Sequence, residues 1–497
     1  MSDDDRLYIA VDLGAGSGRV FLAGLRPQEL MLEEIRRFRY PPRHFDGHLR
    51  WDARQILAEI KAGLRLASDR ARQLRRPIHS LGLDSWGVDY GLLDAGGRLL
   101  EDPVCYRDPR TDGIMDAVFE RVPRDEMFAR TGIQLMQINT VFQLFAHARR
   151  GLPAGAAHLL MVPDLMAALL TGRTVTEFSI GTTTQMFDAR TGTWDEEIIS
   201  RLGLPRSLFS AVVPSGSTLG PLLPSVASET ALAGTCVVAP AAHDTGSAVA
   251  GAPLQPGWAY ISSGTWSLVG VERDGVLIDA AVARHNFTNE GGACGTIRFL
   301  KNVTGLWILE SCRQEWRERG VRVDYDDLLH RAASLEATPG LIFPDDPRFL
   351  NPPSMVAAIA EQMTWTGQAP PPEPAALARV ILDSLAFRYA SVLRTIEALT
   401  SVPIEGVQIV GGGSQNQYLN QATATATGKI VLAGPIEATA IGNASVQAIS
   451  AGRFASLADG RSHVERHVRP ARFVPKPTAA WERAARRYAE IEAQLSA

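Results

Sequence analysis

The first 25 residues alternate between short apolar runs and a glycine-rich break. Residues 7–12 and 19–25 are both apolar, and the sequence Gly-Ala-Gly-Ser-Gly at residues 14–18 separates them. Apolar runs of this length are typical of strands, and two strands joined by a tight glycine turn form a β-hairpin. The pattern therefore predicts a hairpin over this segment.

The next part of the chain mixes strand and helix patterns. Apolar positions recur with a helical period over residues 51–68, and strands are predicted at residues 78–83 and 88–93. Residues 113–172 are predicted to be mostly helical, with breaks at glycine and proline. A further strand is expected at residues 236–240, before a helix that begins at about residue 243. This alternation predicts an α/β fold.

The order of strand, small-residue turn and strand returns half a chain later. Residues 258–270 contain two apolar runs around the turn Ser262-Ser-Gly-Thr265. Repetition at this distance indicates a duplicated domain, and the Gly- and Pro-rich residues 251–257 are the expected break between the two copies. We therefore expect domains at residues 1–253 and 254–497.

The second half continues the alternation. Helical patterns cover residues 303–319 and 374–399, and a strand at residues 406–410 leads into Gly411-Gly-Gly-Ser-Gln-Asn416. A strand at residues 429–432 and a helix from about residue 437 follow. Both halves are thus predicted to combine strands with helices.

Length and composition narrow the class of protein. A chain of 497 residues is too long for one ordinary core, and 45% hydrophobic with 21% charged residues is typical of globular proteins. The net charge of −4 argues against binding to duplex nucleic acid, which requires a basic face. Four cysteines are too few for a disulfide scaffold, and the lack of a Cys-x-x-Cys pair argues against a thiolate zinc site. The pattern predicts lone buried thiols.

Export and membrane signals are also missing from the pattern. The N-terminal segment is acidic and lacks the basic-then-apolar order of a signal peptide. The most apolar stretch, residues 156–170, is shorter than the about 20 residues that span a bilayer. We expect a cytoplasmic monomer or homodimer without nucleic-acid or membrane partners.

The glycine turn after residue 12 is the first candidate for chemistry. Backbone N–H groups of such a turn can bind phosphate oxygens, and Asp12 at the strand end could place magnesium, directly or through water. The dinucleotide pattern G-x-G-x-x-G fails because Arg19 stands at its third glycine, and the P-loop pattern is absent. An ordinary hairpin turn remains the structural alternative.

Three further segments could bind a ligand. Hydroxyl and N–H groups of the turn at residues 262–265 could meet the same phosphates, and the glycines at residues 411–413 allow close approach to the backbone. Asp244, in His243-Asp-Thr-Gly246 after an apolar strand, could act as a general base on a hydroxyl. The structural alternatives are a Ser/Thr-rich turn, a tight strand-to-helix connection and an Asp that caps the following helix.

These four motifs, in this order and spacing, resemble the FGGY family of carbohydrate kinases from about residue 6 to residue 475. Supporting segments include AVDLGAGSGRV, GLDSWGVDYGLLD, AHDTGSAV, YISSGTWSLVG, TNEGGACGTIRFLKNVTGLW and IVGGGSQNQYLNQ. The resemblance implies an actin-like ATPase (ribonuclease H-like) α/β fold, with two duplicated domains and a cleft for ATP and sugar between them.

The resemblance also assigns roles to individual positions. It implies that the ATP-binding residues are Ala15, Gly16, Ser17, Gly18, Arg19, Thr265, Glu310 and Gly412. It implies a sugar site of Gly87, His243, Asp244, Thr245 and Asn302, with Asp244 as catalytic base and Asp12 at Mg²⁺. Two positions depart from the pattern: serine is common at Gly16, and glutamine is common at Glu310, where a carboxylate would repel phosphate.

The implied activity is ATP-dependent phosphorylation of L-rhamnulose at O1 in L-rhamnose catabolism, since the chain is most similar to that branch of the family. Kinases for other ketoses or polyols, such as L-fuculose or D-xylulose, remain alternatives. So do a non-enzymatic actin-like nucleotide switch and a binding module that has lost catalysis. The retained Asp12, Asp244 and both turns argue against the last of these.

Overall fold

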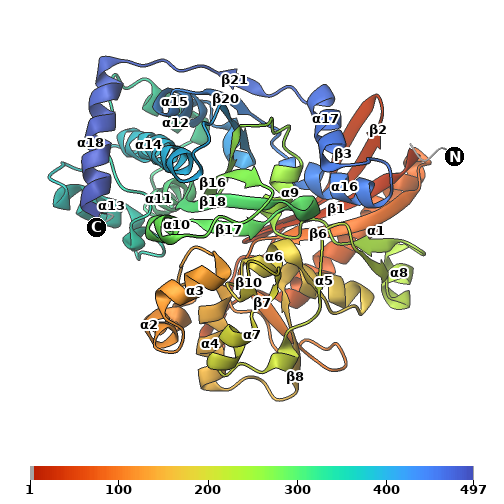
Figure 1. The fold of residues 1–497 in the computed structure, drawn as a ribbon. Helices are drawn as coiled ribbons and strands as arrows, with labels where there is room; N and C mark the ends of the chain where they lie inside the picture. Colours follow the sequence, from red (N-terminus) through yellow and green to blue (C-terminus); the bar gives the residue numbers. More distant parts are fainter. Residues whose placement is uncertain (1–4, 496–497) are drawn as a thin grey trace. The chain divides into compact units, whose positions relative to one another are not determined.

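The computed structural model describes residues 5–495, which form two compact units (Figure 1). The first unit contains the chain up to Pro253 together with Glu272–Phe299 and Glu437–Val468. The second contains Leu254–Val271, Leu300–Ile436 and the C-terminal segment from Arg469. These units are defined by compactness and not by chain order, so the boundary expected between residues 253 and 254 stays a prediction.

A mixed sheet is the centre of the first unit, in the order β13-β14-β6-β1-β2-β3. Its strands are β1 (Leu7–Gly14), β2 (Ser17–Arg26), β3 (Glu29–Arg39), β6 (Ile78–Ser85), β13 (Thr218–Pro221) and β14 (Cys236–Val238). Strands β1 and β2 form the predicted antiparallel hairpin, while β1 pairs with β6 in parallel. The third strand, β3, extends the hairpin and was not predicted, because the charged pairs Glu33-Glu34 and Arg36-Arg37 interrupt both a continuous apolar run and a strict alternation.

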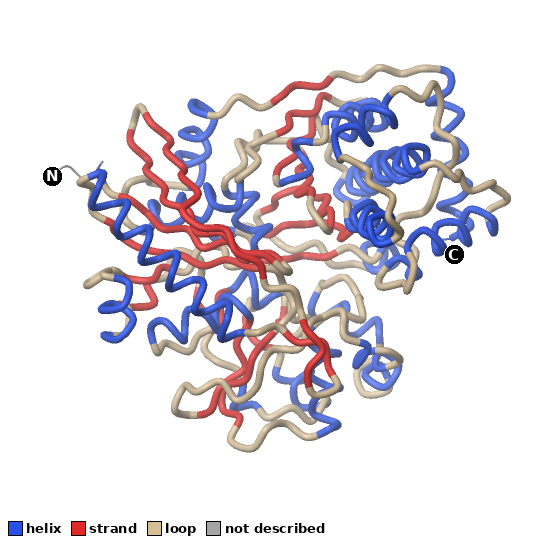
Figure 2. Tube along the Cα trace, turned by 180° about the vertical axis from the view of Figure 1, so that it is seen from behind, coloured by secondary structure: helices blue, strands red, loops and turns tan. Residues whose placement is uncertain are grey.

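Helices cover both faces of this sheet. Helix α1 (Ala53–Leu74) is capped by Asp52, whose carboxylate accepts from the backbone N–H of Gln55 at 2.8 Å. Figure 2 shows this helix alongside the strands. Its Gly63 approaches Val20 on one face. Phe21, the next residue of β2, points to the opposite face and clusters with Ala440 of α16 (Ala438–Ser450).

Helix α16 joins the first unit through polar as well as apolar contacts. The amide of Gln447 donates to the carbonyl of Ile9 at 2.9 Å, and its oxygen accepts from the Ser80 hydroxyl at 2.8 Å. These hydrogen bonds pair the buried polar groups of the helix with groups of β1 and β6. They attach α16 to the sheet although the two are far apart in the sequence.

The rest of the first unit is a smaller α/β region and several short elements. The region's apolar core includes Val141, Phe142, Leu159, Phe187 and Trp194. The remaining elements are β4 (Arg43–Phe45), β5 (His48–Arg50), β7 (Tyr90–Asp94), α2 (Ile114–Phe119), α3 (Arg124–Thr131), α4 (Thr140–Arg150), β8 (Ala156–Met161), α5 (Val162–Thr171), β9 (Thr176–Glu177), α6 (Phe178–Thr182), β10 (Phe187–Asp188), β11 (Thr193–Trp194), α7 (Glu196–Arg201), β12 (Val212–Val213), α8 (Pro224–Thr230), α9 (Asp244–Ala250), α10 (Ala280–His285), β17 (Thr288–Gly291) and α17 (Leu457–His467). The expected helical stretch at residues 113–172 is therefore interrupted by a strand, since β8 pairs with β7.

The second unit repeats the pattern of a hairpin followed by a parallel strand. Strand β15 (Ala259–Ser263) pairs antiparallel with β16 (Trp266–Arg273) and parallel with β19 (Gly406–Val410), which confirms the second predicted hairpin. The order continues through β20 and β21. Its other elements are β18 (Ile297–Thr304), α11 (Trp307–Glu318), α12 (Tyr325–Ala333), α13 (Met355–Trp365), α14 (Pro374–Thr400), α15 (Gln417–Thr427), β20 (Ile430–Ala433), β21 (Ala471–Phe473) and α18 (Ala479–Leu495).

The four cysteines are free thiols. Cys105 and Cys312 are buried as expected, but Cys294 is exposed and Cys236 is half-buried. None of the helices within residues 5–495 has both the length and the apolar character required to cross a membrane.

Candidate functional site

Three carboxylates lie at the carboxyl ends of adjacent strands in the first unit. Asp12 and Asp84 are register partners on the parallel strands β1 and β6, so their side chains project from the same face. Beyond β14, the chain continues beside β6, where Ser85 forms an isolated bridge with His243. This bridge puts Asp244, the next residue, at the same edge of the sheet.

The surroundings of Asp84 and Asp244 disfavour the charged forms of these two carboxylates. Burial raises the pKa of Asp84 well above its ordinary value, and the neighbouring Asp12 and Asp244 raise it further. Burial also raises the pKa of Asp244, although His243 opposes this shift. Asn443 of α16 donates to one oxygen of Asp84 at 2.6 Å, whereas the other oxygen is buried without a hydrogen-bond partner among residues 5–495.

This environment fits a bound cation. Carboxylate oxygens are the ligands that Mg²⁺ prefers, and a cation would relieve the mutual repulsion of Asp12, Asp84 and Asp244. Within the described part of the chain, however, no three His, Cys, Asp or Glu side chains are grouped closely enough to hold a metal by themselves. An ion here would need water or ligand oxygens to complete its coordination.

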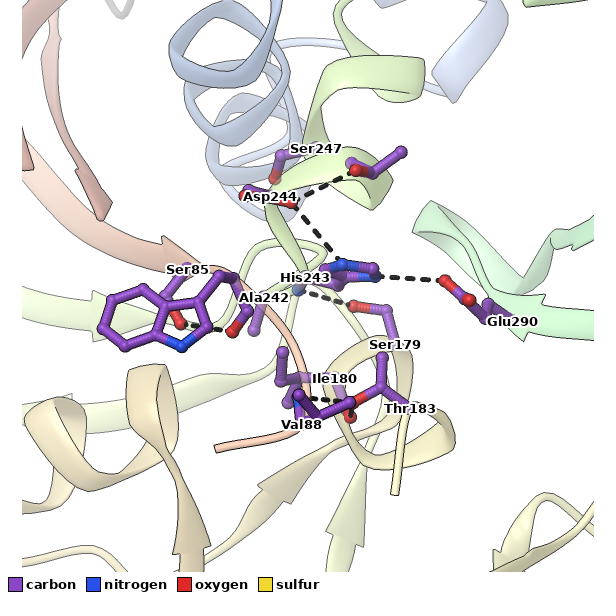
Figure 3. Close-up of polar contacts among 12 residues, drawn as sticks. Ser85, Val88, Ser179, Ile180, Thr183, Ala242, His243, Asp244, Ser247 and Glu290 are labelled. Atoms are coloured by element: carbon purple, nitrogen blue, oxygen red, sulfur yellow. Dashed lines mark hydrogen bonds and ion pairs between the residues drawn. The ribbon is translucent and has the colours of Figure 1, made fainter. Parts of the chain in front are cut away.

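Asp244 begins helix α9 but does not cap it. The N-cap position is His243, and no side-chain oxygen caps the first turn. The Asp244 carboxylate instead accepts from the Thr245 hydroxyl at 3.1 Å and lies 3.5 Å from Nε2 of His243 (Figure 3). With 30% of its side chain exposed in an otherwise buried segment, Asp244 is available to a ligand, and the expected capping alternative is wrong.

The backbone before Asp244 is held by the small helix α6. The N–H of His243 donates to the Ser179 hydroxyl at 3.1 Å (Figure 3). The N–H of Ala242 donates to the Glu177 carboxylate at 3.0 Å. Glu177 also accepts from the backbone and hydroxyl of Ser179 at 2.9 and 2.5 Å. These contacts fix the position at which α9 begins.

The turn between β1 and β2 has its carbonyl groups engaged from one side. Tyr40 donates its backbone N–H to the carbonyl of Gly16 at 3.0 Å, and its hydroxyl lies 2.7 Å from the carbonyl of Gly14 and 3.1 Å from that of Ser17. Gly16 has a φ of +118°, which favours glycine. Carbonyl oxygens repel an anion, but here Tyr40 hydrogen-bonds to those of the turn. The turn is therefore suited to bind an anion such as phosphate.

The predicted phosphate-binding residues of this turn differ in exposure. Ala15 and Ser17 are exposed, Gly16 and Arg19 are half-buried, and Gly18 is buried. Arg19 forms ion pairs with Asp12 at 2.5 Å and with Glu437. Its charge is thus already compensated by carboxylates of the same unit.

A buried carboxylate supports the aromatic side chains beside Gly87. One oxygen of Asp89 accepts the indole N–H groups of Trp51 and Trp86 at 2.7 and 3.0 Å, and its other oxygen accepts from Gln143 at 3.2 Å. The two indole rings lie 4.8 Å apart between centroids. Asp89 therefore fixes the orientation of Trp86, which immediately precedes the predicted sugar-binding Gly87.

The Asp89→Asn variant should remove a pH-dependent contribution to stability. Burial raises the pKa of Asp89 to about 6, although hydrogen bonds from Trp86, Trp51 and Gln143 oppose the shift. At pH values above the pKa that Asp89 has in the unfolded chain and below about 6, the carboxyl group of Asp89 is protonated only in the folded chain. The free energy of unfolding therefore falls as the pH rises through this range. We expect the wild-type free energy of unfolding, relative to the variant, to fall by about 1.4 kcal/mol between about pH 5 and pH 8.

Urea denaturation at several pH values measures this difference, with Asp274→Asn as the control because Asp274 is exposed. The asparagine amide would also face the donor amide of Gln143, but that cost is the same at every pH. A wild-type minus variant difference that is flat across the range would contradict the prediction.

The second unit holds the other predicted residues. The carbonyl of Thr265, in the exposed turn between β15 and β16, accepts the backbone N–H groups of Gly305 and Trp307 at 3.1 and 3.2 Å. This joins the turn to the start of α11, where Glu310 is exposed and forms ion pairs with Arg317 at 2.8 Å and with Arg313. Glu310 is thus already paired with cations in a position where glutamine was expected.

Gly412 and Asn302 lie on two further elements of the second unit. Gly412 is exposed, with open space where a Cβ would lie, and begins the short turn (Gly412–Gln415) after β19. The adjoining Gly411, with a φ of +82°, passes close to the carbonyl of Ser263 at the end of β15. Asn302 is half-buried on β18. The turn containing Thr265 and the glycines after β19 therefore lie near one another.

Sequence reasoning did not assign several residues that shape these sites. Tyr40, Ser179, Glu290 and Arg298 contact the predicted residues from other elements of the chain. Asp84 and its partner Asn443 were not assigned either, nor was Glu177, which holds Ala242 beside His243. The one available signal was the presence of charged residues in apolar segments, as for Glu290 and Arg298. Their partners depend on tertiary contacts.

Comparison with known proteins identifies the family. Residues 7–251 match the N-terminal domain and residues 259–451 the C-terminal domain of the FGGY family of carbohydrate kinases. Curated relatives named rhamnulokinase include one from Bacteroides thetaiotaomicron, 43% identical over 96% of this chain and 97% of its own. One from Pectobacterium carotovorum is 42% identical over 94% of this chain and 93% of its own.

Solved structures with the same fold are much more distant in sequence. A xylulose kinase from Lactobacillus acidophilus aligns with a TM-score of 0.80 at 14% identity, covering 99% of both chains. A xylulose kinase from Rhodospirillum rubrum aligns with a TM-score of 0.79 at 20% identity, again covering 99% of both. These likenesses confirm the two-domain α/β fold of the actin-like ATPase type. With both family domains matched along most of its length, the chain belongs to the FGGY family of carbohydrate kinases.

Proposed function

We propose that this kinase transfers the γ-phosphoryl group of ATP to O1 of L-rhamnulose, which yields L-rhamnulose 1-phosphate in L-rhamnose catabolism. The observation that carries the proposal is the 43% identity, over nearly the full length of both chains, to a relative named rhamnulokinase. The likeness to xylulose kinase structures, at 14–20% identity, supports the fold alone. The proposed sugar is inferred from the curated relatives of higher identity.

Asp244 is the proposed general base. Its carboxylate accepts the proton of the substrate's O1–H while that oxygen forms a bond to the γ-phosphorus, and the bond to the ADP oxygen breaks. Its partial exposure at the start of α9 supports this role, since the neighbouring residues of the segment are buried. His243 and Thr245, which contact the same carboxylate, are proposed to bind the sugar together with Gly87 and Asn302.

Phosphate binding is assigned mainly to backbone groups. Residues 15–19 and Thr265 are proposed to contact the phosphates of ATP, while Gly412 and Glu310 are proposed to lie at the nucleoside. Magnesium held by Asp12, directly or through water, would neutralise phosphate charge when bound, and phosphate oxygens with water would complete its coordination. The carboxylate cluster around Asp12 supports this assignment. Positioning and electrostatics supply most of the catalysis in phosphoryl transfer.

A coupled assay of ADP release against a panel of ketoses tests the proposed substrate. We expect the highest kcat/KM on L-rhamnulose, because the relatives that span nearly the whole chain carry that name. If kcat/KM were highest on L-fuculose or D-xylulose, the proposed substrate would be wrong, while the proposed reaction, phosphoryl transfer from ATP to a sugar, would stand. ATP hydrolysis at a rate that no sugar changes would favour the nucleotide-switch alternative.

A further inference from the structure

The side chain of Arg298 is completely buried behind His243. Its Nε donates to the carbonyl of Gly291 at 2.9 Å, and its Nη2 contacts Nδ1 of His243 at 2.9 Å. The same Nη2 donates to Oε2 of Glu290, on β17, at 3.2 Å. One terminal nitrogen of the guanidinium thus faces both the imidazole and a carboxylate.

These contacts determine which nitrogen of His243 carries the proton. A guanidinium is always protonated and can only donate, so Nδ1 of His243 has to accept from Arg298 through its lone pair. A neutral imidazole with a bare Nδ1 carries its hydrogen on Nε2. Nε2 is the nitrogen that lies 3.5 Å from the carboxylate of Asp244.

Glu290 is the competing partner for the imidazole. Its Oε2 lies 3.2 Å from Nδ1 of His243, and Figure 3 shows this carboxylate on the side of the ring away from Asp244. A hydrogen on Nδ1 would point to Glu290 but would oppose the N–H of Arg298 at 2.9 Å. Since Nη2 carries two hydrogens, it can donate to both acceptors, and Glu290 then serves to neutralise the buried cation.

We propose that Arg298 is a positioning residue that fixes His243 as the Nε2–H tautomer, so that the imidazole presents a donor to Asp244. This rests on the proposed function, in which Asp244 is the base. An N–H on that side stabilises the ionised carboxylate and favours one orientation of it. The reversed tautomer would place a lone pair there, which repels the charge. At 3.5 Å the contact is long, and we expect it to shorten when substrate binds.

The tautomer can be read directly, without any assay of turnover. Two-bond ¹H–¹⁵N correlation spectra of perdeuterated protein labelled with ¹⁵N-histidine, at about pH 8 where ordinary histidine is neutral, separate protonated from bare ring nitrogens. The His243 signals are assigned by their loss in His243→Gln. We expect a bare Nδ1 and a protonated Nε2. A protonated Nδ1 in the wild type overturns the proposal, and this measurement requires no variant of Arg298.

Variants of Arg298 test whether that residue is the cause. Arg298→Met should give a substantial Nδ1–H population directed at Glu290 and lower kcat by about 10- to 100-fold, the scale known for partners that orient metal-binding histidines. Arg298→Lys, which keeps a cationic donor, should restore the Nε2–H tautomer and part of kcat. Arg379→Met is the matched control, because it removes a buried guanidinium from α14 in the second unit. Thermal unfolding of all three shows which variants fold.

The outcomes separate this proposal from the proposed function. An unchanged tautomer in folded Arg298→Met, or a kcat loss no larger than that of Arg379→Met, overturns the positioning role. If the tautomer responds as expected while L-rhamnulose is not a substrate, the role of Arg298 stands and the proposed substrate fails.

Discussion

Asp244→Asn is expected to lower kcat by at least about 100-fold, the usual contribution of a general base, while the protein remains folded. Asparagine has nearly the same shape and can still accept from the Thr245 hydroxyl, but it cannot take up the proton of the substrate's O1–H. Steady-state kinetics with saturating ATP and sugar measure the loss. Circular dichroism and the midpoint of thermal unfolding check the fold.

Asp274→Asn is a suitable control, because it makes the same chemical change at an exposed position of the first unit and should leave kcat unchanged. A second readout is the pH profile. Since burial raises the pKa of Asp244, wild-type kcat/KM should fall as acid protonates it, at a higher pH than for an ordinary aspartate. Near-normal turnover by a folded Asp244→Asn variant would falsify the assignment of the base.

Gly442→Ala is expected to lower the free energy of unfolding by about 2 kcal/mol or more. A Cβ at this position would lie 1.8 Å from the carbonyl oxygen of Ser247 and 2.6 Å from the backbone N of Gly251. Both contacts are with the backbone of α9 or its end, which cannot move aside like a flexible side chain. Overpacking costs about 1–3 kcal/mol and occasionally more, and two backbone contacts this short place Gly442 at or above the upper end of that range. The helix preference of alanine returns at most about 1 kcal/mol, which leaves a net loss of about 2 kcal/mol or more.

The same variant should lower kcat, since α9 begins with Asp244 and would be displaced from α16. Gly275→Ala is the control: a Cβ there meets nothing within 4 Å, and we expect both stability and kcat to stay near their wild-type values. Urea denaturation of the pair gives the difference in stability. If Gly442→Ala were as stable as Gly275→Ala, the close packing of α9 against α16 would be contradicted.

Local patterns were sufficient to locate both hairpins and the motifs on them. The apolar runs around residues 14–18 and 262–265 predicted antiparallel pairs, and the structure confirms both. Such signals are local, because a tight turn and two apolar runs depend on neighbouring residues. Strand β8 was missed inside a stretch expected to be helical, because its pairing with β7 is decided by residues far away in the chain.

The sequence by itself determined the α/β class, the order of the motifs and, through its likeness to a family, the proposed roles of Asp12, Asp244 and the glycine turns. Only the tertiary structure brought Asp84 beside Asp12, seated α16 against the sheet of the first unit, and buried Arg298 against His243. The physical reason is the range of the interactions: turn geometry and apolar periodicity are set within a few residues. Desolvation and pairing of buried charges depend on partners from distant elements.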